Sequence, residues 1–460
     1  MKKFDLIIIG GGPGGYVAAI RAAQLKLKVA IVEDKHLGGI CLNWGCIPTK
    51  ALLKNADVLH TIQNAALYGI DIKDFTVNWK MVIKRSRDIS KRLSKGIEYL
   101  LKKNKITHIS GRGELISNTQ VVVKSENEKE KKISAKNIII STGSRPKYFP
   151  NIIPDAKRII TSREAMILKE KPASIVIIGA GAIGIEFAHF YNSFGTKVTI
   201  IESMTHILPN EDKDVADELA KIFNKRGIEI ITGELVDSVE NQGGNIEVVL
   251  KSKEKIISDY AIVAVGAQSN IENIGLEKVG IKTKYGSILV NQYLQTNEEN
   301  IFAIGDVVGP PMLAHKASRE AIVAVEKIAN KDPEPMKYDN IPSCVYSNPE
   351  IASVGLTEKK ALEAGYKIKV GKFPFRALGK SMASGETDGF VKVIYDEKYG
   401  EMIGCHIIGF EATNLITEAT IARRLETTWH EVLETIHPHP TLSEGLLEAT
   451  ADALGEAIHI

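Results

Sequence analysis

The chain has 460 residues, of which 44% are apolar and 25% are charged. This length is too great for one hydrophobic core and predicts three or more domains. The formal net charge of +3, from 59 Lys and Arg against 56 Asp and Glu, excludes a strongly basic surface, so we do not expect nucleic acid as a partner.

Short apolar runs and few cysteines predict a cytoplasmic protein. The apolar run after Met1-Lys2-Lys3 covers only residues 6–9 and ends in glycines, which is typical of a strand and not of a signal peptide. No run of about 20 apolar residues is present, so we expect no membrane span. Four cysteines are too few for a disulfide scaffold, and in a cytoplasmic protein a close cysteine pair is more often catalytic or metal-binding.

Two segments, residues 4–33 and 174–202, repeat one nucleotide-binding pattern. Each predicts a strand, a Gly-rich turn, a helix, a second strand and a final acid. The three glycines allow a tight turn, the approach of a pyrophosphate and helix–strand packing, and the acid binds a ribose hydroxyl. A tight turn followed by a surface Glu is the alternative, but the complete repeat favours two nucleotide sites. The matched residues are Gly10, Gly12, Gly15 and Glu33 in the first copy and Gly179, Gly181, Gly184 and Glu202 in the second.

Glu202 favours NAD over NADP. A carboxylate at this position bonds a free ribose 2′-hydroxyl and repels a 2′-phosphate, whereas an NADP site usually has an Arg nearby. Residues 203–206 contain no Arg.

Cys41 and Cys46 follow the first nucleotide pattern and lie five residues apart. On an ideal helix their Cα atoms would be roughly 8.6 Å apart, whereas a disulfide needs less than about 7 Å. A pairing therefore requires a break in the helix, for which Gly45 supplies the freedom. Pro48 disfavours helical angles at Ile47 and predicts a helix that starts near Pro48, with Cys46 at its N-terminus, where the dipole favours thiolate. Two unpaired thiols or a metal site are the alternatives, but no second ligand pair is nearby.

The remaining elements follow from apolar and charged patterning. Charged residues 124–136 predict an exposed hairpin connection between strands at 120–123 and 137–140. Further strands are expected at 260–265, 301–306, 389–395 and 401–408, and helices at 314–330, 412–426 and 443–458. The strands at 389–395 and 401–408 and the helices at 412–426 and 443–458 are expected to form a separate α+β domain beginning at 338.

Six motifs make the chain resemble the pyridine nucleotide–disulfide oxidoreductases, and within them the members that oxidise dihydrolipoyl groups. The match runs from Asp5 to the C-terminus. The motifs are GGGPGG at 10–15, GGICLNWGCIPTKALL at 38–53, GAGAIGIE at 179–186, IFAIGDV at 301–307, MLAHKA at 312–317 and HPHPTLSE at 437–444. The resemblance implies an α/β fold with two Rossmann-like dinucleotide-binding domains and a C-terminal α+β dimerisation domain. The implied domains are 1–147 (FAD-binding), 148–268 (NAD-binding), 269–337 (central, completing the FAD site) and 338–460 (dimer interface).

The same resemblance implies two cofactor sites. Asp306 is expected to bond the ribityl or pyrophosphate part of FAD, although it could instead cap the next helix. The FAD residues implied are Gly10, Gly12, Gly14, Gly15, Glu33, Lys50, Gly113, Thr142, Gly143, Ser144, Asp306, Met312, Leu313, Ala314 and His315. The NAD residues implied are Gly179, Gly181, Gly184, Glu186, Glu202, Val236 and Gly266.

The catalytic roles are implied in the same way. Cys41 is expected to exchange with the substrate and Cys46 to face the flavin, near Lys50 and its acidic partner Glu186. Trp44 departs from the family, which often has a small or aliphatic residue between the cysteines.

His439 is expected to be the general acid–base, with a pKa suited to neutral pH, and Glu444 to orient its imidazole. His437 is expected to have a structural role. Thr441 and Glu444 also fit a helix capping box, which is compatible with the catalytic role. The His439–Pro440 bond is a candidate for the cis form.

The resemblance implies a homodimer in which His439 of one subunit faces the dithiol of the other. The implied substrates are lipoyl domains of an acyltransferase or a glycine-cleavage H-type protein, with electrons passing through the Cys41–Cys46 disulfide and FAD to NAD⁺.

Other interpretations fit less well. Glutathione and trypanothione reductases share the cysteines but normally prefer NADP. Mercuric reductases and high-molecular-weight thioredoxin reductases have a C-terminal redox pair, whereas this chain ends Ala457-Ile458-His459-Ile460. Soluble transhydrogenases lack the dithiol. A purely structural or docking subunit is a different class, and the intact catalytic residues argue against it.

Overall fold

Five parallel strands form the first of two similar sheets. The computed structural model describes residues 2–125 and 128–460, and in it this sheet has the order β3-β2-β1-β6-β19. An antiparallel ribbon, β4 and β5, continues from the first half of β6. The strands are β1 (Lys2–Ile9), β2 (Val29–Glu33), β3 (Thr107–Ser110), β4 (Arg112–Ser117), β5 (Gln120–Ser125), β6 (Glu128–Ile140) and β19 (Ile301–Ala303).

The second sheet repeats the design of the first. Its parallel order is β11-β10-β9-β15-β8, and a three-stranded antiparallel meander, β12-β13-β14, precedes β15 in the chain. The strands are β8 (Ile159–Ile160), β9 (Ser174–Ile178), β10 (Lys197–Glu202), β11 (Glu229–Thr232), β12 (Val236–Asn241), β13 (Ile246–Leu250), β14 (Lys255–Ser258) and β15 (Tyr260–Val263). The internal repeat predicted from the sequence is therefore a repeat of topology.

Glycines shape both strand–helix turns. Gly10 and Gly179 have φ of +107° and +102°, a conformation that L side chains rarely adopt. A Cβ at Gly15 would lie 1.9 Å from the Gly10 carbonyl oxygen, so the third glycine lets helix α1 (Pro13–Gln24) pack on β1. In the second copy, Gly184 lets α6 (Ala182–Ser193) pack on β9 in the same way.

The chain passes between the two sheets through a short antiparallel ladder. Strand β7 (Ser144–Pro146) leads out of the first unit, and β16 (Ala267–Ser269) leads back beside it. The Thr142 hydroxyl donates to the Asn270 carbonyl oxygen at 2.7 Å and so links the outgoing segment to the returning one. Residues 142–144 therefore lie where the first unit meets the second.

A five-stranded antiparallel sheet forms the C-terminal domain, in the order β20-β21-β24-β23-β22. Helix α13 packs on β22 and β23 and α11 on β21 and β24, while α7 of the second unit contacts β24. Strands β23 and β24 are buried at every position, so both faces of the sheet are covered. The elements are β20 (Ser343–Val345), β21 (Glu350–Gly355), β22 (Ile368–Pro374), β23 (Phe390–Asp396), β24 (Met402–Gly409), α7 (Lys213–Lys225), α11 (Ala412–Arg424) and α13 (Glu444–Ala453).

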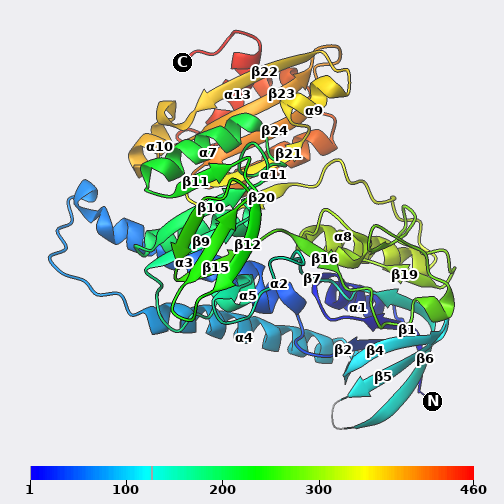
Figure 1. The fold of residues 1–460 in the computed structure, drawn as a ribbon. Helices are drawn as coiled ribbons and strands as arrows, with labels where there is room; N and C mark the ends of the chain where they lie inside the picture. The colour runs from blue at the N-terminus through cyan, green and yellow to red at the C-terminus, as the bar shows by residue number, and fades with distance from the viewer. Residues whose placement is uncertain (1, 126–127) are drawn as a thin grey trace.

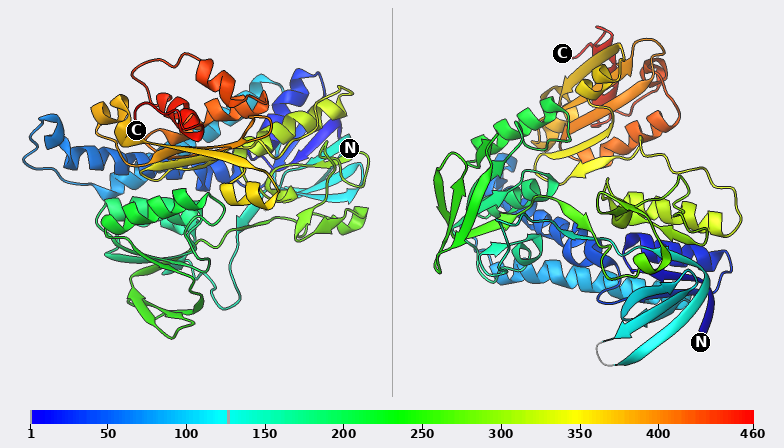
Figure 2. Two further views of the ribbon diagram at one scale, coloured as in Figure 1. Left: turned by 90° about the horizontal axis from the view of Figure 1, so that it is seen from above. Right: turned by 45° about the vertical axis from the view of Figure 1, so that its right-hand side comes forward.

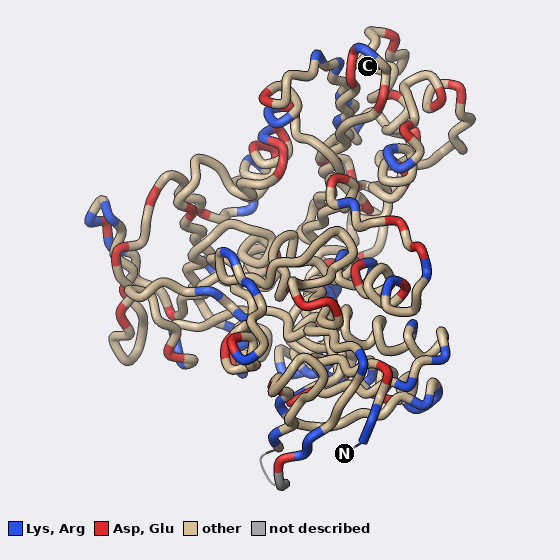
Figure 3. Tube along the Cα trace, turned by 90° about the vertical axis from the view of Figure 1, so that its right-hand side faces the viewer, with Lys and Arg blue, Asp and Glu red and all other residues tan. Residues whose placement is uncertain are grey.

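Figure 1 shows this domain above the two nucleotide-binding units, and the two views in Figure 2 show the three parts from other sides. The architecture confirms the predicted α/β fold class with a C-terminal α+β domain. Figure 3 shows basic and acidic residues interspersed along the trace, as the net charge of +3 predicts. Among the described residues, no helix is both long and apolar enough to cross a membrane.

Several of the expected element bounds were wrong: β15 ends at Val263, β19 at Ala303 and α8 (Ala314–Ile328) at Ile328, each earlier than expected, and three further segments differ as follows. The charged segment 124–136 belongs mostly to β5 and β6, where Ile133 and Ala135 are buried and the exposed residues are Lys124, Glu130, Lys131, Lys132 and Lys136. Residues 126–127 of that expected connection lie outside the described part. Helix α11 ends at Arg424, before Glu426 with φ +56°. Helix α13 ends at Ala453, before Gly455 with φ +75°, and does not reach Ile458.

Gly184→Ala is expected to lower the free energy of unfolding by about 1–3 kcal/mol or more, because a Cβ there would lie 2.0 Å from the Gly179 carbonyl oxygen. Gly181→Ala is the matched control, since a Cβ there meets no atom within 4 Å. Urea denaturation of both variants measures the difference, and equal losses would contradict the packing argument.

Candidate active site

Cys41 and Cys46 lie on two helices that are separated by one residue. Helix α2 (Gly39–Trp44) ends at Gly45, whose φ of −150° and ψ of −115° interrupt the helix, and α3 (Cys46–Gln63) begins immediately afterwards. The predicted break at Gly45 and the predicted position of Cys46 at a helix N-terminus are confirmed.

The prediction that α3 starts near Pro48 was wrong by two residues. Ile47 is helical in spite of Pro48, so the steric bias of a proline against helical angles at the preceding residue is overridden here. The missing N–H of Pro48 is a separate matter, because the first turn of a helix makes no use of its backbone N–H groups. A proline in the third helical position therefore costs no hydrogen bond. The Thr49 side chain donates to the Gly45 carbonyl oxygen at 2.7 Å and tightens this turn.

The two thiols contact one another and have opposite pKa shifts. The hydrogen bond from Cys41 lowers the pKa of Cys46 to about 7, against the opposing effect of burial, and nearby Lys50 lowers it further. The same hydrogen bond raises the pKa of Cys41 above its ordinary value, with burial as the next cause. The expected thiolate character of Cys46 thus has the neighbouring thiol as its main cause, and the helix N-terminus contributes less.

Lys50 and Glu186 form an ion pair across the two units. The Lys50 Nζ lies 2.8 and 2.9 Å from the two Glu186 oxygens, and the Glu186 side chain is 6% exposed. The Tyr346 backbone N–H donates to Glu186 at 3.1 Å, and the Lys50 Nζ lies 4.4 Å from the Tyr346 ring centroid. The pair therefore joins α3, α6 and the C-terminal domain beside the dithiol.

The acids of the two nucleotide patterns make equivalent contacts. Glu33 accepts a hydrogen bond at 2.7 Å from the Gly11 backbone N–H, and Glu202 accepts one at 2.8 Å from the Ala180 backbone N–H. Each carboxylate fixes the glycine turn of its own unit, and its remaining lone pairs are available to a ribose hydroxyl. The Met204 backbone N–H donates to the second oxygen of Glu202 at 2.8 Å.

Asp306 lies beside the crossing between the units. It follows β19 in a short 3₁₀ turn, and its carboxylate accepts a hydrogen bond from the Ser144 hydroxyl at 2.6 Å. Helix α8 (Ala314–Ile328) has Leu313 as its N-cap and no side-chain cap, so the alternative that Asp306 caps this helix is wrong.

A buried ion pair beneath Asp306 was not predicted. Lys316 and Glu320 are 3.2 Å apart, and both side chains are fully buried. The Lys316 Nζ donates to the carbonyl oxygens of Gly305 and Gly309, while Glu320 accepts from the Gly305 N–H and the Tyr338 hydroxyl. Burial raises the pKa of Glu320. The i, i+4 spacing of Lys316 and Glu320 could have predicted an ion pair on α8. It could not have predicted that the pair is buried, because exposed helices show the same spacing as often.

The other expected cofactor residues are dispersed around these centres. Gly113 packs against Ile9 and Val32 at the carboxyl ends of β1 and β2, and Gly14 packs against Ile304. Val236 is buried in the core of the second unit, so only its backbone can meet a cofactor.

The remaining expected cofactor residues lie in loops or at the start of a helix. Gly143 and Gly266 have φ of +70° and +106° in the loops that follow β6 and β15. Met312, Leu313, Ala314 and His315 lead into α8, where the exposed His315 contacts the Pro342 carbonyl oxygen at 2.9 Å.

His439 and Glu444 form the expected pair in the C-terminal domain. The His439 Nδ1 lies 2.8 Å from a Glu444 oxygen, and the imidazole is 76% exposed. The His439–Pro440 bond is cis, as predicted. The capping-box prediction was half wrong: the Thr441 N–H donates to Glu444, but its hydroxyl donates to Pro438, because α13 begins only at Glu444.

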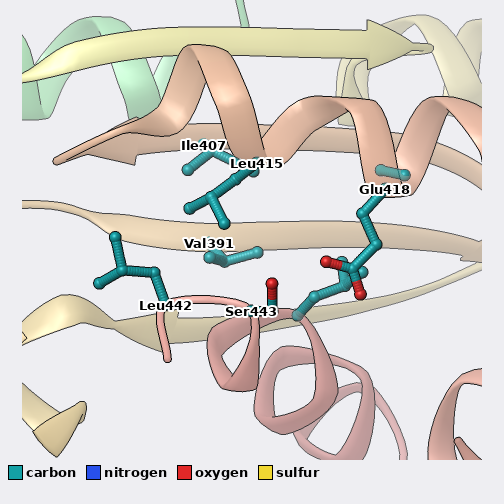
Figure 4. A pocket seen from close by; sticks show the side chains of 8 residues that line it. Val391, Ile407, Leu415, Glu418, Leu442 and Ser443 are labelled. Carbon is teal, nitrogen blue, oxygen red and sulfur yellow. The ribbon is translucent and has the colours of Figure 1, made fainter. Parts of the chain in front are cut away.

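His437 has a different environment from His439. Its imidazole is 4% exposed and its Nε2 lies 3.2 Å from Glu418 on α11, and this contact raises the pKa of His437. Glu418 also borders an internal cavity of about 10 Å³ between the sheet, α11 and α13 (Figure 4). That cavity has room for no more than one water and is not a substrate site.

The two glycine turns fit dinucleotides. Helices α1 and α6 have Gly12 and Gly181 as N-caps without a side-chain cap, so their first N–H groups face the open side of each turn. A Cβ at Gly12 would meet only one atom within 4 Å and a Cβ at Gly181 none. Backbone N–H groups at an open helix N-terminus are suited to a pyrophosphate.

The chain belongs to the pyridine nucleotide-disulphide oxidoreductase family. The model of that family matches residues 4–321, and the model of the family's dimerisation domain matches residues 341–450. Family membership implies FAD and NAD as cofactors.

Curated relatives with this architecture are named dihydrolipoyl dehydrogenase. The protein from Zymomonas mobilis is 49% identical, with 99% of both chains covered, and that from Bacillus subtilis is 44% identical, also with 99% of both covered. The solved structure of LpdA from Mycobacterium tuberculosis has a TM-score of 0.92 at 26% identity and covers 98% of this chain and 99% of its own. The HOCl-induced flavoprotein disulfide reductase RclA from Escherichia coli has a TM-score of 0.87 at 26% identity, with coverage of 97% and 99%.

The reduced protein is expected to react with iodoacetamide first at Cys46. Thiolate forms above the pKa, so alkylation of Cys46 should rise through about pH 7 while Cys41 stays protonated. Burial raises the pKa of Cys344 to about 11 and that of Cys405 to about 12, so these thiols are internal controls. Peptide mass spectrometry at several pH values gives the order, and earlier reaction at Cys41 would contradict the assigned pKa shifts.

Proposed function

We propose that this protein oxidises protein-bound dihydrolipoyl groups to lipoyl disulfide and reduces NAD⁺. The observation that carries the proposal is the Cys41–Cys46 pair beside the Lys50–Glu186 ion pair, at the junction of two nucleotide-binding units. The relatives named dihydrolipoyl dehydrogenase support the same substrate. The proposed domains are residues 1–147 for FAD, 148–268 for NAD, 269–337 for the central part and 338–460 for the dimer interface.

The His439–Glu444 pair is proposed to activate the substrate. When Nδ1–H donates to Glu444, Nε2 is left as the basic atom on an exposed imidazole. Nε2 accepts the proton of one dihydrolipoyl thiol, and the resulting thiolate attacks the sulfur of Cys41 in the Cys41–Cys46 disulfide. The disulfide breaks, and Cys46 departs as the thiolate.

The second substrate thiol then releases the product. It attacks the mixed disulfide on its substrate sulfur, so the lipoyl disulfide forms and Cys41 leaves as a thiol with the proton that His439 held. The proton of the attacking thiol passes to His439 Nε2 in its place and from there to solvent. Bound FAD would take the electron pair of the resulting dithiol and supply it to NAD⁺ as hydride. Residues Gly12, Glu33, Ser144 and Asp306 are proposed to hold FAD, and Gly181 and Glu202 to hold NAD⁺.

The proposed active unit is a homodimer. Figure 1 shows α13, which begins at Glu444, in the C-terminal domain, and α2, which carries Cys41, in the lower half of the molecule. The match to the dimerisation domain supports a homodimer. In the proposed dimer, His439 of one protomer takes the proton of a substrate that reacts with Cys41 of the partner subunit. Lipoyl domains of an acyltransferase or a glycine-cleavage H-type protein are the proposed substrates, and the cytoplasm is the proposed location.

The direct test mixes the purified FAD-loaded protein with dihydrolipoamide and NAD⁺ and follows NADH formation, with NADP⁺ in a parallel reaction. We expect rapid NADH formation and little NADPH, because Glu202 repels a 2′-phosphate. Lack of turnover by a protein with bound FAD and both thiols intact would overturn the proposed substrate. Equal rates with both nucleotides would overturn the role of Glu202.

His439→Gln is expected to lower kcat for dihydrolipoamide by about 10²- to 10⁴-fold, because the variant lacks the base that accepts the substrate proton. His430→Gln is the matched control, since His430 is an exposed histidine of the same domain. Stopped-flow absorbance measures both variants. A loss of the same size in His430→Gln, or an unchanged rate in His439→Gln, would remove His439 from the reaction.

A further inference from the structure

Trp44, between the two cysteines, contacts two arginines. The guanidinium carbons of Arg87 and Arg163 each lie 4.3 Å from the Trp44 ring centroid. Arg87 comes from the long helix α4 (Trp79–Lys103), and Arg163 from α5 (Ser162–Ala165) near the start of the second unit. One indole therefore connects three segments that are far apart in the sequence.

Helix α2 depends on such outside contacts for its position. It has only six residues and ends at the break at Gly45, and a helix this short has little stability of its own. Asn43 holds its start by donating to the carbonyl oxygens of Leu37 and Gly39 at 3.1 and 2.9 Å. Its end is held from α4, where Ser94 donates to the Asn43 side chain at 3.0 Å and Arg87 donates to the Asn43 carbonyl oxygen.

Two like charges, Arg87 and Arg163, lie against the same indole ring. Burial and the nearby positive charge of Arg163 lower the pKa of Arg87. The Arg87 Nη1 is buried and has no hydrogen-bond partner among the described residues. An aromatic face attracts guanidinium groups, so the indole offsets the cost of bringing two like charges together beside the redox pair.

We propose that Trp44, Arg87 and Arg163 form a clamp that positions Cys41 against Cys46 and ties the redox helix to the second unit. The clamp makes Trp44 and Arg163 positioning residues, and the inference rests on the proposed redox role of the two cysteines. A fixed helix α2 holds the two sulfurs together and favours their disulfide. A released α2 lowers the effective concentration of one thiol near the other, which favours the dithiol.

The test measures the exchange of the purified FAD-loaded protein with glutathione. In this reaction two glutathione thiols are oxidised to one glutathione disulfide, while the Cys41–Cys46 bond is reduced to two thiols. Thiol labelling at fixed glutathione ratios gives the equilibrium constant without any turnover assay. Arg163→Met should shift it toward the dithiol by about 2- to 5-fold, as expected when one cation–π contact is lost near the surface. Trp44→Leu removes the contacts of both arginines and should shift it by about 5- to 30-fold.

Three comparisons separate positioning from a general loss of structure. Arg163→Lys keeps a cation beside the ring, so its equilibrium constant should stay close to that of the parent protein. Arg158→Met removes the contact of Arg158 with the Tyr260 ring, 5.2 Å away in the same unit, and should leave the exchange unchanged. The double variant Trp44→Leu/Arg163→Met should shift no further than Trp44→Leu alone, because Trp44→Leu already removes the contact between Trp44 and Arg163.

The outcomes also separate the clamp from the proposed function. In one outcome the parent protein exchanges with glutathione, and the equilibrium constants of Trp44→Leu and Arg163→Met stay within about twofold of the parental constant. That outcome would overturn the clamp alone. An equal shift in Arg158→Met would overturn it too. A parent protein that forms no Cys41–Cys46 disulfide at any glutathione ratio would overturn the proposed function and the clamp together.

Discussion

The interruption of one helix at Gly45 is the constraint on which the redox chemistry depends. An unbroken helix from Gly39 to Gln63 would hold Cys41 and Cys46 too far apart and on different faces. The break brings the thiols together and leaves Cys46 at the start of a new helix. It also leaves Lys50 one turn further on, on the side that meets Glu186 of the second unit. One residue of non-helical backbone thus aligns the thiols, a cation and the junction between the units.

Two groups of charged side chains in the proposed site are in environments that are unfavourable by themselves. Lys316 and Glu320 are fully buried, and removal of one partner from such a pair typically destabilises a fold by about 3–5 kcal/mol. Their hydrogen bonds hold the Gly305 turn and therefore place Asp306 next to Ser144. The second group is the pair of arginines, Arg87 and Arg163, whose like charges both lie against Trp44. Both sets fix loops and short helices that have little stability of their own, and both lie where the proposed site needs a fixed backbone.

Local spacing predicted much of this arrangement, and long-range contacts account for the rest. The repeated glycine turns and the break at Gly45 depend on residues close in sequence. The His439–Glu444 contact was expected from the family resemblance, since local spacing by itself favoured a capping box. The start of α3 was wrong because the bias of Pro48 against helical angles at Ile47 is a preference and not a prohibition, and the structure places Ile47 within the helix. The charged ribbon was misjudged because charge indicates exposure and says nothing of strand pairing. Arg87, Arg163 and the burial of Lys316 could not be predicted, since each is defined by a partner on another element.

The unequal thiols explain why the proposed reaction has a direction. In disulfide exchange the sulfur with the lower pKa departs faster, so a nucleophile that meets the Cys41–Cys46 bond expels Cys46 and bonds to Cys41. When Cys41 is bonded to the substrate sulfur it carries no S–H, so the group that stabilises the departing Cys46 thiolate is the nearby Lys50, whose charge lowers the pKa of Cys46. Glu186, paired with Lys50, opposes that effect. The same geometry that forms the disulfide thus also selects the sulfur that is attacked, which leaves the other free to pass electrons onward.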